Sequence, residues 1–509
     1  MMNGREKSDS AIVAMKPANE AGRPVEERVE RRAGTEGNGV WPDTHRTQIR
    51  GRVPRGLDRI REAAQRKQER FTGLLHHVDV EALRQAYQGL KPDAAAGVDG
   101  MTWQDYGVDL EPRLVDLHGR VHRGAYRPQP SRRTYIAKAD GRLRPLAIAA
   151  LEDKIVQSAV ARVLSAIWEE DFLGFSYGFR PGRSAHDALD ALVVGIERRR
   201  VNYILDADIR DFFGTVSQDW LIRFVEHRVG DKRIVRLIQK WLRAGILEDG
   251  VVTVSDGGTG QGSVISPLLA NLYLHYVLDL WAVLWRRREA TGDMIIVRYA
   301  DDLVAGFESE EDARRFLAAM RLRLGEFALS LHPEKTRLIE FGRHAADERK
   351  RRGQGKPETF NFLGFTFICG KSRSGKFLIK RKSRRDRRQA KLKEVKVELR
   401  RRMHQPIPEQ GKWLCQIIAG FFNYHAVPTN MPALVAFRDG IAERWRRALR
   451  RRSQTGSMTW ERMKKLVDDL LPKPTIQHPW PNKRFDVRHP RWEPDARKTH
   501  VRICAGGAR

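Results

Sequence analysis

Cysteine is scarce in this chain, with only three residues among 509, Cys369, Cys415 and Cys504. Because they are few, odd in number and far apart, they provide neither a disulfide framework nor a four-cysteine zinc site. The sequence also lacks an apolar run of about 18 residues, and its start lacks the apolar core of a signal peptide. We therefore expect no membrane partner and a cytoplasmic location.

Acidic residues are outnumbered, since 64 Asp and Glu stand against 94 Lys and Arg and leave a formal net charge of +30. Such an excess favours a polyanionic partner. It is densest between residues 371 and 402, which contain 16 Lys and Arg but 3 Asp and Glu, a net charge of +13. A solvated face does not need this density, so we predict phosphate contacts here. The residues predicted to make these phosphate contacts are Arg381, Lys382, Arg384 and Arg385.

Aromatic residues are nearly missing from the first 50 positions, where Trp41 is the exception. A polar, charged segment of this kind cannot bury enough apolar surface to order itself, and we predict a flexible tail over residues 1–56. Apolar residues at helical spacing begin at Leu57. Between residues 392 and 449 three more apolar stripes at this spacing predict a helical bundle.

The chain does contain carboxylates in two settings that suit metal binding. Tyr299-Ala300-Asp301-Asp302 lies between two apolar, β-prone runs and predicts a hairpin with two adjacent carboxylates at its tip. Over residues 203–209 the apolar side chains at 203, 205, 207 and 209 alternate with those at 204, 206 and 208. This pattern predicts a strand with Asp206 and Asp208 on one face. An isolated Asp-Asp pair is usually only a polar turn. Together, however, three carboxylates from two strands can hold two divalent ions and support nucleotidyl transfer.

Four segments resemble the conserved blocks of reverse transcriptases, in the order in which that family has them. They are residues 175–184, the strand ending at Asp208 with Phe213 beyond it, residues 261–271 and the box at 299–302. The similarity is greatest to the enzymes encoded within bacterial group II introns, which are also maturases, and it extends over roughly residues 57–509. Residues 419–430 are similar to the maturase signature of these proteins.

The resemblance implies an α+β right-hand polymerase with fingers, an antiparallel-sheet palm and a helical thumb with a maturase domain. The expected organisation is a tail at 1–56, an N-terminal extension and fingers at 57–200, a palm at 201–370, the thumb and maturase domain at 371–452 and a basic segment at 453–509. A Cys/His endonuclease domain, which some relatives carry, is not expected because the cysteine pairs are missing.

The resemblance also implies roles for individual residues. Asp208, Asp301 and Asp302 are expected to hold two Mg²⁺ ions, with Asp208 chosen over Asp206 because only Asp208 has the following Ile and the correct distance to Phe213. Phe213 is expected to lie under the sugar of the incoming nucleotide and to exclude a 2′-hydroxyl. The other nucleotide contacts are expected to be Lys138 and Arg144 on a basic hairpin, Gln261 and Lys335.

Nucleic-acid contacts are expected from Arg180 and Arg183, along the template, and from Gly364, where primer backbone passes close. Alternatives stay open for several of these residues. The hairpin with Lys138 and Arg144 could instead be a solvated basic turn, and Lys335 an ordinary surface lysine. Arg180 and Arg183 could instead form ion pairs that tie their loop to nearby acidic residues. The aromatic residues of 419–430 are more simply the core of the bundle.

The sequence thus predicts an RNA-directed DNA polymerase and maturase that binds group II intron RNA, assists its splicing and copies it into DNA at a target site. Its partners would be that RNA, the target DNA and deoxynucleoside triphosphates. Two alternatives remain, a splicing-only maturase and a reverse transcriptase recruited to a defence or diversity-generating system. The sequence does not predict an oligomeric state.

Overall fold

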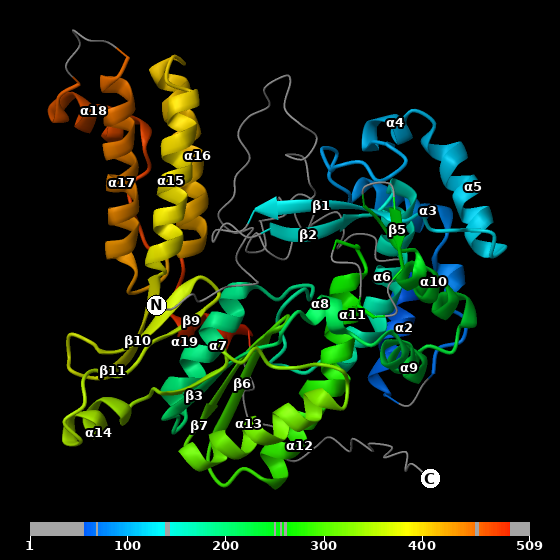
Figure 1. Cartoon of the computed structure of the whole chain (residues 1–509), viewed down its shortest axis with the longest axis horizontal. Helices are drawn as coiled ribbons and strands as arrows, with labels where there is room; N and C mark the ends of the chain where they lie inside the picture. The colour runs from blue at the N-terminus through cyan, green and yellow to red at the C-terminus, as the bar shows by residue number, and fades with distance from the viewer. Residues whose placement is uncertain are drawn as a thin grey trace.

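The computed structural model describes residues 55–67, 70–137, 143–248, 251–254, 257–258, 262–452 and 458–488. Figure 1 shows an N-terminal group of helices, a central sheet with helices around it, and a helical bundle that stands apart from both. Most of the expected tail at 1–56, the side chain of Arg144, and Lys138 and Gln261 lie outside the described residues.

The N-terminal helices pack on the long helix α6 and form one side of the largest apolar core. Side chains cap their starts, because Asp79 accepts a hydrogen bond at α3 and Thr102 forms a capping box at α4. The elements are α2 (Arg55–Gln65), the 3-10 turn η2 (Leu75–His77), α3 (Val80–Gln88), α4 (Trp103–Gly107), α5 (Leu110–His122) and α6 (Leu151–Asp171).

The basic hairpin is present and is part of a four-stranded sheet of order β2-β1-β4-β5. Strands β1 (Ser131–Ala137) and β2 (Leu143–Ile148) pair antiparallel, as the sequence predicted. Strand β4 (Ile246–Glu248) runs parallel to β1 and pairs with β5 (Val251–Thr253). Between the hairpin and this last pair the chain forms the palm's first strand and five helices, so the sheet joins distant segments.

The palm is an antiparallel sheet of order β6-β7-β3-β8, which confirms the fold class expected from the sequence. Both faces are covered, because alternate residues of β3 belong to different apolar cores. Leu205 and Ala207 pack with the α6 core, whereas Ile204 packs with α7 and the aromatic side chains of a smaller sheet. The strands are β3 (Tyr203–Asp208), β6 (Met294–Tyr299), β7 (Asp302–Phe307) and β8 (Arg337–Glu340).

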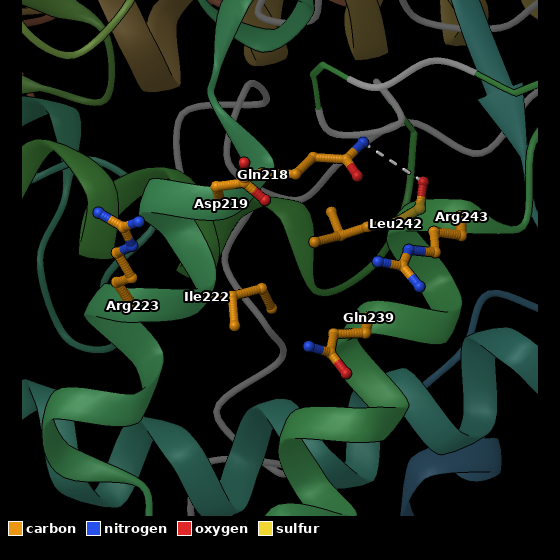
Figure 2. A pocket seen from close by; sticks show the side chains of 7 residues that line it. All are labelled: Gln218, Asp219, Ile222, Arg223, Gln239, Leu242 and Arg243. Atoms are coloured by element: carbon orange, nitrogen blue, oxygen red, sulfur yellow. Dashed lines mark hydrogen bonds between the residues drawn. The ribbon is translucent and has the colours of Figure 1, made fainter.

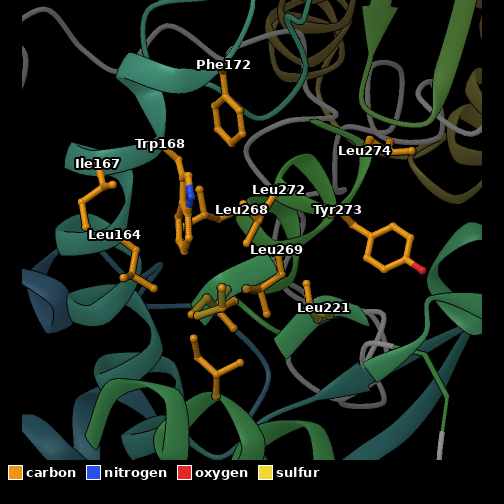
Figure 3. Close-up of a cluster of buried hydrophobic side chains, with 14 of the residues drawn as sticks. Leu164, Ile167, Trp168, Phe172, Leu221, Leu268, Leu269, Leu272, Tyr273 and Leu274 are labelled. Atoms are coloured by element: carbon orange, nitrogen blue, oxygen red, sulfur yellow. The ribbon is translucent and has the colours of Figure 1, made fainter. Parts of the chain in front are cut away.

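Helices bury the face of the palm that carries Leu205 and Ala207. Figure 3 shows Trp168 of α6 beside Leu268 of α11 in this core, with Phe172 directly after α6. The helical stretch Ser266–Arg288 is long and apolar enough to cross a membrane, but 72% of its most apolar part is buried inside the protein, as in a core helix. The helices around the palm are α7 (Ala185–Arg198), α8 (Phe212–Thr215), α9 (Gln218–Arg228), α10 (Lys232–Arg243), α11 (Ser266–Leu274), the π-turn η3 (His275–Asp279), α12 (Leu280–Arg288), α13 (Glu310–Gly325) and α14 (Ala345–Arg351).

The thumb begins after a three-stranded sheet of order β11-β10-β9, made by β9 (Phe360–Phe362), β10 (Phe365–Lys371) and β11 (Phe377–Ser383). This sheet crosses the boundary predicted at residue 370. The bundle follows, and its core includes α18, which the sequence had placed in a separate segment. Its helices are α15 (Arg385–Arg401), α16 (Ile407–His425), α17 (Met431–Arg450) and α18 (Trp460–Leu470); α19 (Pro481–Arg488) returns to α7 (Figure 1).

Candidate active site

The predicted carboxylates meet at one end of the palm sheet. Asp208 ends β3 and lies opposite Asp302, the first residue of β7, in the antiparallel register. Asp301 occupies the two-residue turn between β6 and β7. Asp208 is 8% exposed and Asp301 is 7% exposed. The prediction that two separate segments bring these three residues together is therefore consistent with the structure.

A close backbone contact supports the turn that carries Asp301. Ala300 has a φ of +54°, a conformation that costs energy for a residue with a side chain. Gly178 lies directly against it, since a Cβ atom built at Gly178 would be 2.2 Å from the Ala300 nitrogen. Only glycine permits this approach. The block at 175–184 is thus packed on the turn formed by Ala300 and Asp301, which we name the catalytic turn after its proposed role.

Lys335 contacts the site directly. Its Nζ lies 2.6 Å from Oδ2 of Asp208, and its side chain is 17% exposed. The backbone amide of His332 donates to the carbonyl of Asp208 at 2.7 Å, which fixes the loop that carries the lysine. Lys335 is therefore not an ordinary surface lysine.

The donor chemistry of the site suits hard divalent cations. Carboxylate oxygens from Asp208, Asp301 and Asp302 are the ligand type that Mg²⁺ prefers. Within the described parts of the chain, no three His, Cys, Asp or Glu side chains already form a metal cluster. Burial raises the pKa of the nearby Asp206 to about 7, and Arg337 at 3.9 Å only partly offsets this effect.

Phe213 lies on the short helix α8, close to Gly258 of the segment 257–262, which we call the glycine-rich loop. The ring is half-buried and meets Phe212 edge-on, with 5.3 Å between the centroids. Gly258 has a φ of +85°, and a Cβ built there would be 2.8 Å from the Phe213 carbonyl. At Gly262 a Cβ would be 1.9 Å from the carbonyl of Ala147, just beyond Leu146 of the basic hairpin. Gly258 thus lies against the helix that carries Phe213, and Gly262 lies against strand β2 of that hairpin.

Four of the predicted nucleic-acid contacts are buried, and for the three arginines among them this burial corrects the assignment. The four are Arg180, Gly364, Arg381 and Arg384. Arg180 is 6% exposed, lies 3.0 Å from Glu169 and donates to the carbonyls of Leu173 and Ser176. Its guanidinium therefore holds its own loop, the alternative that the sequence left open. A template contact by Arg180 does not agree with this arrangement.

Arg381 and Arg384 are buried in the same way. Arg381 is 2% exposed and lies 2.6 Å from Asp190, while Arg384 is 6% exposed and pairs with Asp386. Their neighbours Lys382 and Arg385 are exposed and stay candidates for phosphate contact. Arg183 is partly exposed, and it donates to the carbonyl of Gly174 at 2.7 Å.

Gly364 follows Leu363 in the tight connection between β9 and β10. Both residues have positive φ, +45° at Leu363 and +79° at Gly364. The hydroxyl of Tyr424 on α16 donates to the Leu363 carbonyl at 2.8 Å, so a thumb helix holds this turn. The burial of Tyr424 and Phe422 agrees with the view that the aromatic residues of 419–430 form core.

A separate hollow contains other residues. It lies between α9 and α10, has a volume of about 360 Å³ and contains none of the predicted residues (Figure 2). Gln218 on its rim donates to the Gly258 carbonyl at 3.1 Å, which connects it to the glycine-rich loop. The lining residues are Gln218, Asp219, Ile222, Arg223, Gln239, Leu242 and Arg243.

Sequence reasoning missed two charged residues beneath the catalytic turn, Arg298 and Asp279. Both are 0% exposed and they form an ion pair at 2.6 Å. A signal was present, because Arg298 interrupts the apolar run before the Tyr-Ala-Asp-Asp box and Asp279 interrupts an apolar helix. Buried charges of this kind are rarely present without a partner.

Comparisons with known proteins agree with this site. Residues 136–367 match the family described as reverse transcriptase (RNA-dependent DNA polymerase), a range that includes all three carboxylates. Protein YkfC of Escherichia coli K12 is 33% identical over 316 residues, which are 56% of this chain and 78% of that protein. Group II intron-encoded protein LtrA of Lactococcus lactis is 36% identical over 200 residues, 38% of this chain and 33% of LtrA.

A more distant relative is nuclear intron maturase 3 of Arabidopsis thaliana, a mitochondrial protein that is 28% identical over 124 residues, 24% of this chain and 17% of that protein. The matches thus cover most of YkfC but a third or less of the two named intron proteins. From the family match and these relatives, the chain belongs to the reverse transcriptases, the RNA-dependent DNA polymerases, and it is similar to a protein encoded in a group II intron.

Proposed function

We propose that this protein binds group II intron RNA, assists its splicing and copies it into DNA at a target site. The observation that carries the proposal is the meeting of Asp208, Asp301 and Asp302 at one end of the palm, within the segment matched by the polymerase family. The chain spans a third or less of the length of the two named intron proteins.

The three carboxylates would hold two Mg²⁺ ions, and their oxygen donors suit that ion. Such ions, when bound, activate the 3′-hydroxyl of a primer and stabilise the departing pyrophosphate. Lys335 would place a positive charge, and a transferable proton, beside the same phosphates. Phe213 would support the deoxyribose ring from below and leave no space for a 2′-hydroxyl.

The remaining site residues would bind and orient the substrates. Lys138 and Arg144 of the basic hairpin and Gln261 of the glycine-rich loop would contact the incoming nucleotide. Arg183, Lys382 and Arg385 would contact the nucleic-acid backbone, and Gly364 would let the primer strand pass close to the protein.

RNA binding is proposed for the exposed face of α15. This helix presents several cations to solvent while Leu392, Val395 and Leu399 pack into the bundle. Lysine and arginine side chains in such a row bind phosphates without regard to sequence, and the affinity falls steeply with salt. The exposed cations of this face are Arg385, Lys393, Lys396, Arg400 and Arg401, and the exposed Lys382 precedes them on β11.

The test uses the transcript that surrounds the coding sequence, with its exons, provided that this RNA folds as a group II intron. We expect the protein to lower the magnesium concentration needed for splicing and to extend a primer annealed to the same RNA. Splicing without extension would indicate a maturase only. Extension without any effect on splicing would indicate a reverse transcriptase of another system.

Two double variants that remove the same number of charges distinguish RNA binding by the face of α15 from the effect of the protein's net charge. Lys393→Gln with Lys396→Gln removes two exposed cations of α15 and should lower the salt dependence of RNA binding by about 1 to 2 units of log-log slope. Arg314→Gln with Arg321→Gln removes two cations from α13 of the palm. We expect the slope of this control to stay at the wild-type value.

A further inference from the structure

A buried ion pair lies directly beneath the catalytic turn. Arg298, the residue before Tyr299 on β6, and Asp279, the last residue of the π-turn η3, are both 0% exposed. Two parallel hydrogen bonds join them, from Nη2 to Oδ2 at 2.6 Å and from Nε to Oδ1 at 2.7 Å. This two-pronged geometry is specific to arginine and fixes the plane of the guanidinium.

The other donors of the guanidinium reach three separate segments. Nη1 donates to the carbonyl of Ala300 at 2.8 Å and to Oδ1 of Asn271 at 3.0 Å, and Nη2 donates to the hydroxyl of Ser176 at 2.7 Å. Asn271 in turn donates to the carbonyl of Gly178 at 2.7 Å. One side chain therefore connects the catalytic turn, helix α11 and the block at 175–178.

The contact with Ala300 acts on the geometry of the catalytic residues. Ala300 has a φ of +54°, and its carbonyl belongs to the peptide unit that leads into Asp301. A donor held at 2.8 Å fixes the orientation of that peptide unit. The backbone of Arg298 is itself held at both sides, because its amide donates to Phe175 and its carbonyl accepts from Tyr177, each at 2.9 Å.

Stability alone does not account for this arrangement. Moving two charges out of water costs several kcal/mol for each ion, and well-packed apolar residues often replace such pairs without loss. The charges here instead provide five directed hydrogen bonds, one of them to the catalytic turn. The π-turn is a further sign, since such turns frequently occur at functional sites.

We infer that Arg298, oriented by Asp279, is a positioning residue for the polymerase reaction: it holds the Ala300 carbonyl so that Asp301 and Asp302 face Asp208. Arg298 itself contacts neither substrate nor metal. The inference rests on the proposed role of the three carboxylates, and its test compares a metal response rather than activity alone.

The test is primer extension by Arg298→Lys at increasing magnesium concentration. Lysine keeps the charge opposite Asp279 but lacks the planar fork that also reaches Ala300. We expect the half-saturating magnesium concentration to rise, or the maximal rate to fall, by about 10-fold or more, as for other residues that orient metal ligands. The affinity for template-primer, measured without nucleotide, should stay at the wild-type value.

Arg228→Lys is the matched control. Arg228 is also buried and lies 3.0 Å from Asp171. It donates to the carbonyl of Ala64 on α2 at 3.0 Å, so its contacts are with the N-terminal helices. We expect it to lower the melting temperature without changing the magnesium response. Ser176→Ala, which removes one acceptor of Arg298, should shift that response in the same direction as Arg298→Lys and provides the test if the lysine variant does not fold.

The outcomes separate this inference from the proposed function. A wild-type chain that extends no primer would count against the proposed function itself. An active wild type whose magnesium response and maximal rate are unchanged in Arg298→Lys and in Ser176→Ala, with only thermal stability lowered, would overturn the positioning role alone.

Discussion

At the scale of single residues, Phe213 is the side chain whose role is easiest to isolate. It is half-buried, whereas its neighbour Phe212 is 2% exposed and belongs to the α6 core. Phe213→Ala should remove the floor of the sugar site and raise the use of ribonucleotides relative to deoxynucleotides by about 10-fold or more, since small steric differences in a pocket are worth that much. Single-nucleotide incorporation with both sugar types measures this ratio.

Phe212→Ala is the control for that substitution. Loss of a buried phenylalanine typically costs about 3–5 kcal/mol of stability, so this variant should be less stable while discriminating between sugars as the wild type does. If sugar discrimination is unchanged in Phe213→Ala but lost in Phe212→Ala, the gate belongs to Phe212 and the assignment is wrong.

In the basic segment at 371–402 the sequence predicted the charge but not which charged side chains are buried. Charge density predicted a cationic surface, and Lys382 and Arg385 are indeed exposed. Strand alternation turns every second residue of β11 inward, so that Arg381 meets Asp190 instead of solvent. The partner lies on α7, far away along the chain, and no local pattern in residues 371–402 reveals it.

At the scale of elements, the segment from Gln477 to α19 joins the thumb to the palm. The amides of Gln477 and His478 donate to the Ala426 carbonyl at the end of α16, at 2.9 and 3.1 Å. On the other side, Arg484 lies 3.4 Å from Asp190 of α7, and Asp486 lies 2.9 Å from Arg198 of the same helix. The segment thus contacts both the thumb and the palm, and these contacts limit the movement of one relative to the other.

This junction should weaken in acid. His478 Nδ1 accepts a hydrogen bond from Arg484 at 2.8 Å, and Nε2 lies 2.8 Å from the Asn423 carbonyl, so its neutral form fits the site. Burial lowers the pKa of His478 and, to a greater extent, that of His186, whose ring centroid is 3.9 Å from it. The charged and titratable groups around the two rings are Arg484, Arg381, His425 and Asp190.

A pKa below the unfolded value near 6.5 means that the unfolded chain binds more protons, so stability is lost as the pH falls below about 6.5. Hydrogen exchange of the amides of Gln477 and His478, corrected for intrinsic rates, should therefore be faster at pH 5.5 than at pH 7.5. The amides of β6 in the palm provide the reference. Equal protection of the junction at both pH values would contradict this account.

At the scale of the whole molecule, the order of the blocks predicted the palm and the helical thumb but not the boundaries between parts. Residue 370 was expected to end the palm, yet β10 and β11 pair across it. Residue 452 was expected to end the bundle, yet Met463, Val467 and Leu471 complete its core. Both errors concern long-range packing, which apolar spacing within one segment does not specify.

The central claim, that Asp208, Asp301 and Asp302 form a polymerase site separate from the RNA-binding surface, is tested most directly by Asp301→Asn. This change removes one of the carboxylates proposed to hold magnesium and alters neither the basic face of α15 nor the apolar cores. Extension of a DNA primer on an RNA template with magnesium should fall by about 100-fold or more, while RNA affinity and melting temperature stay close to wild type. Extension at the wild-type rate would contradict the account.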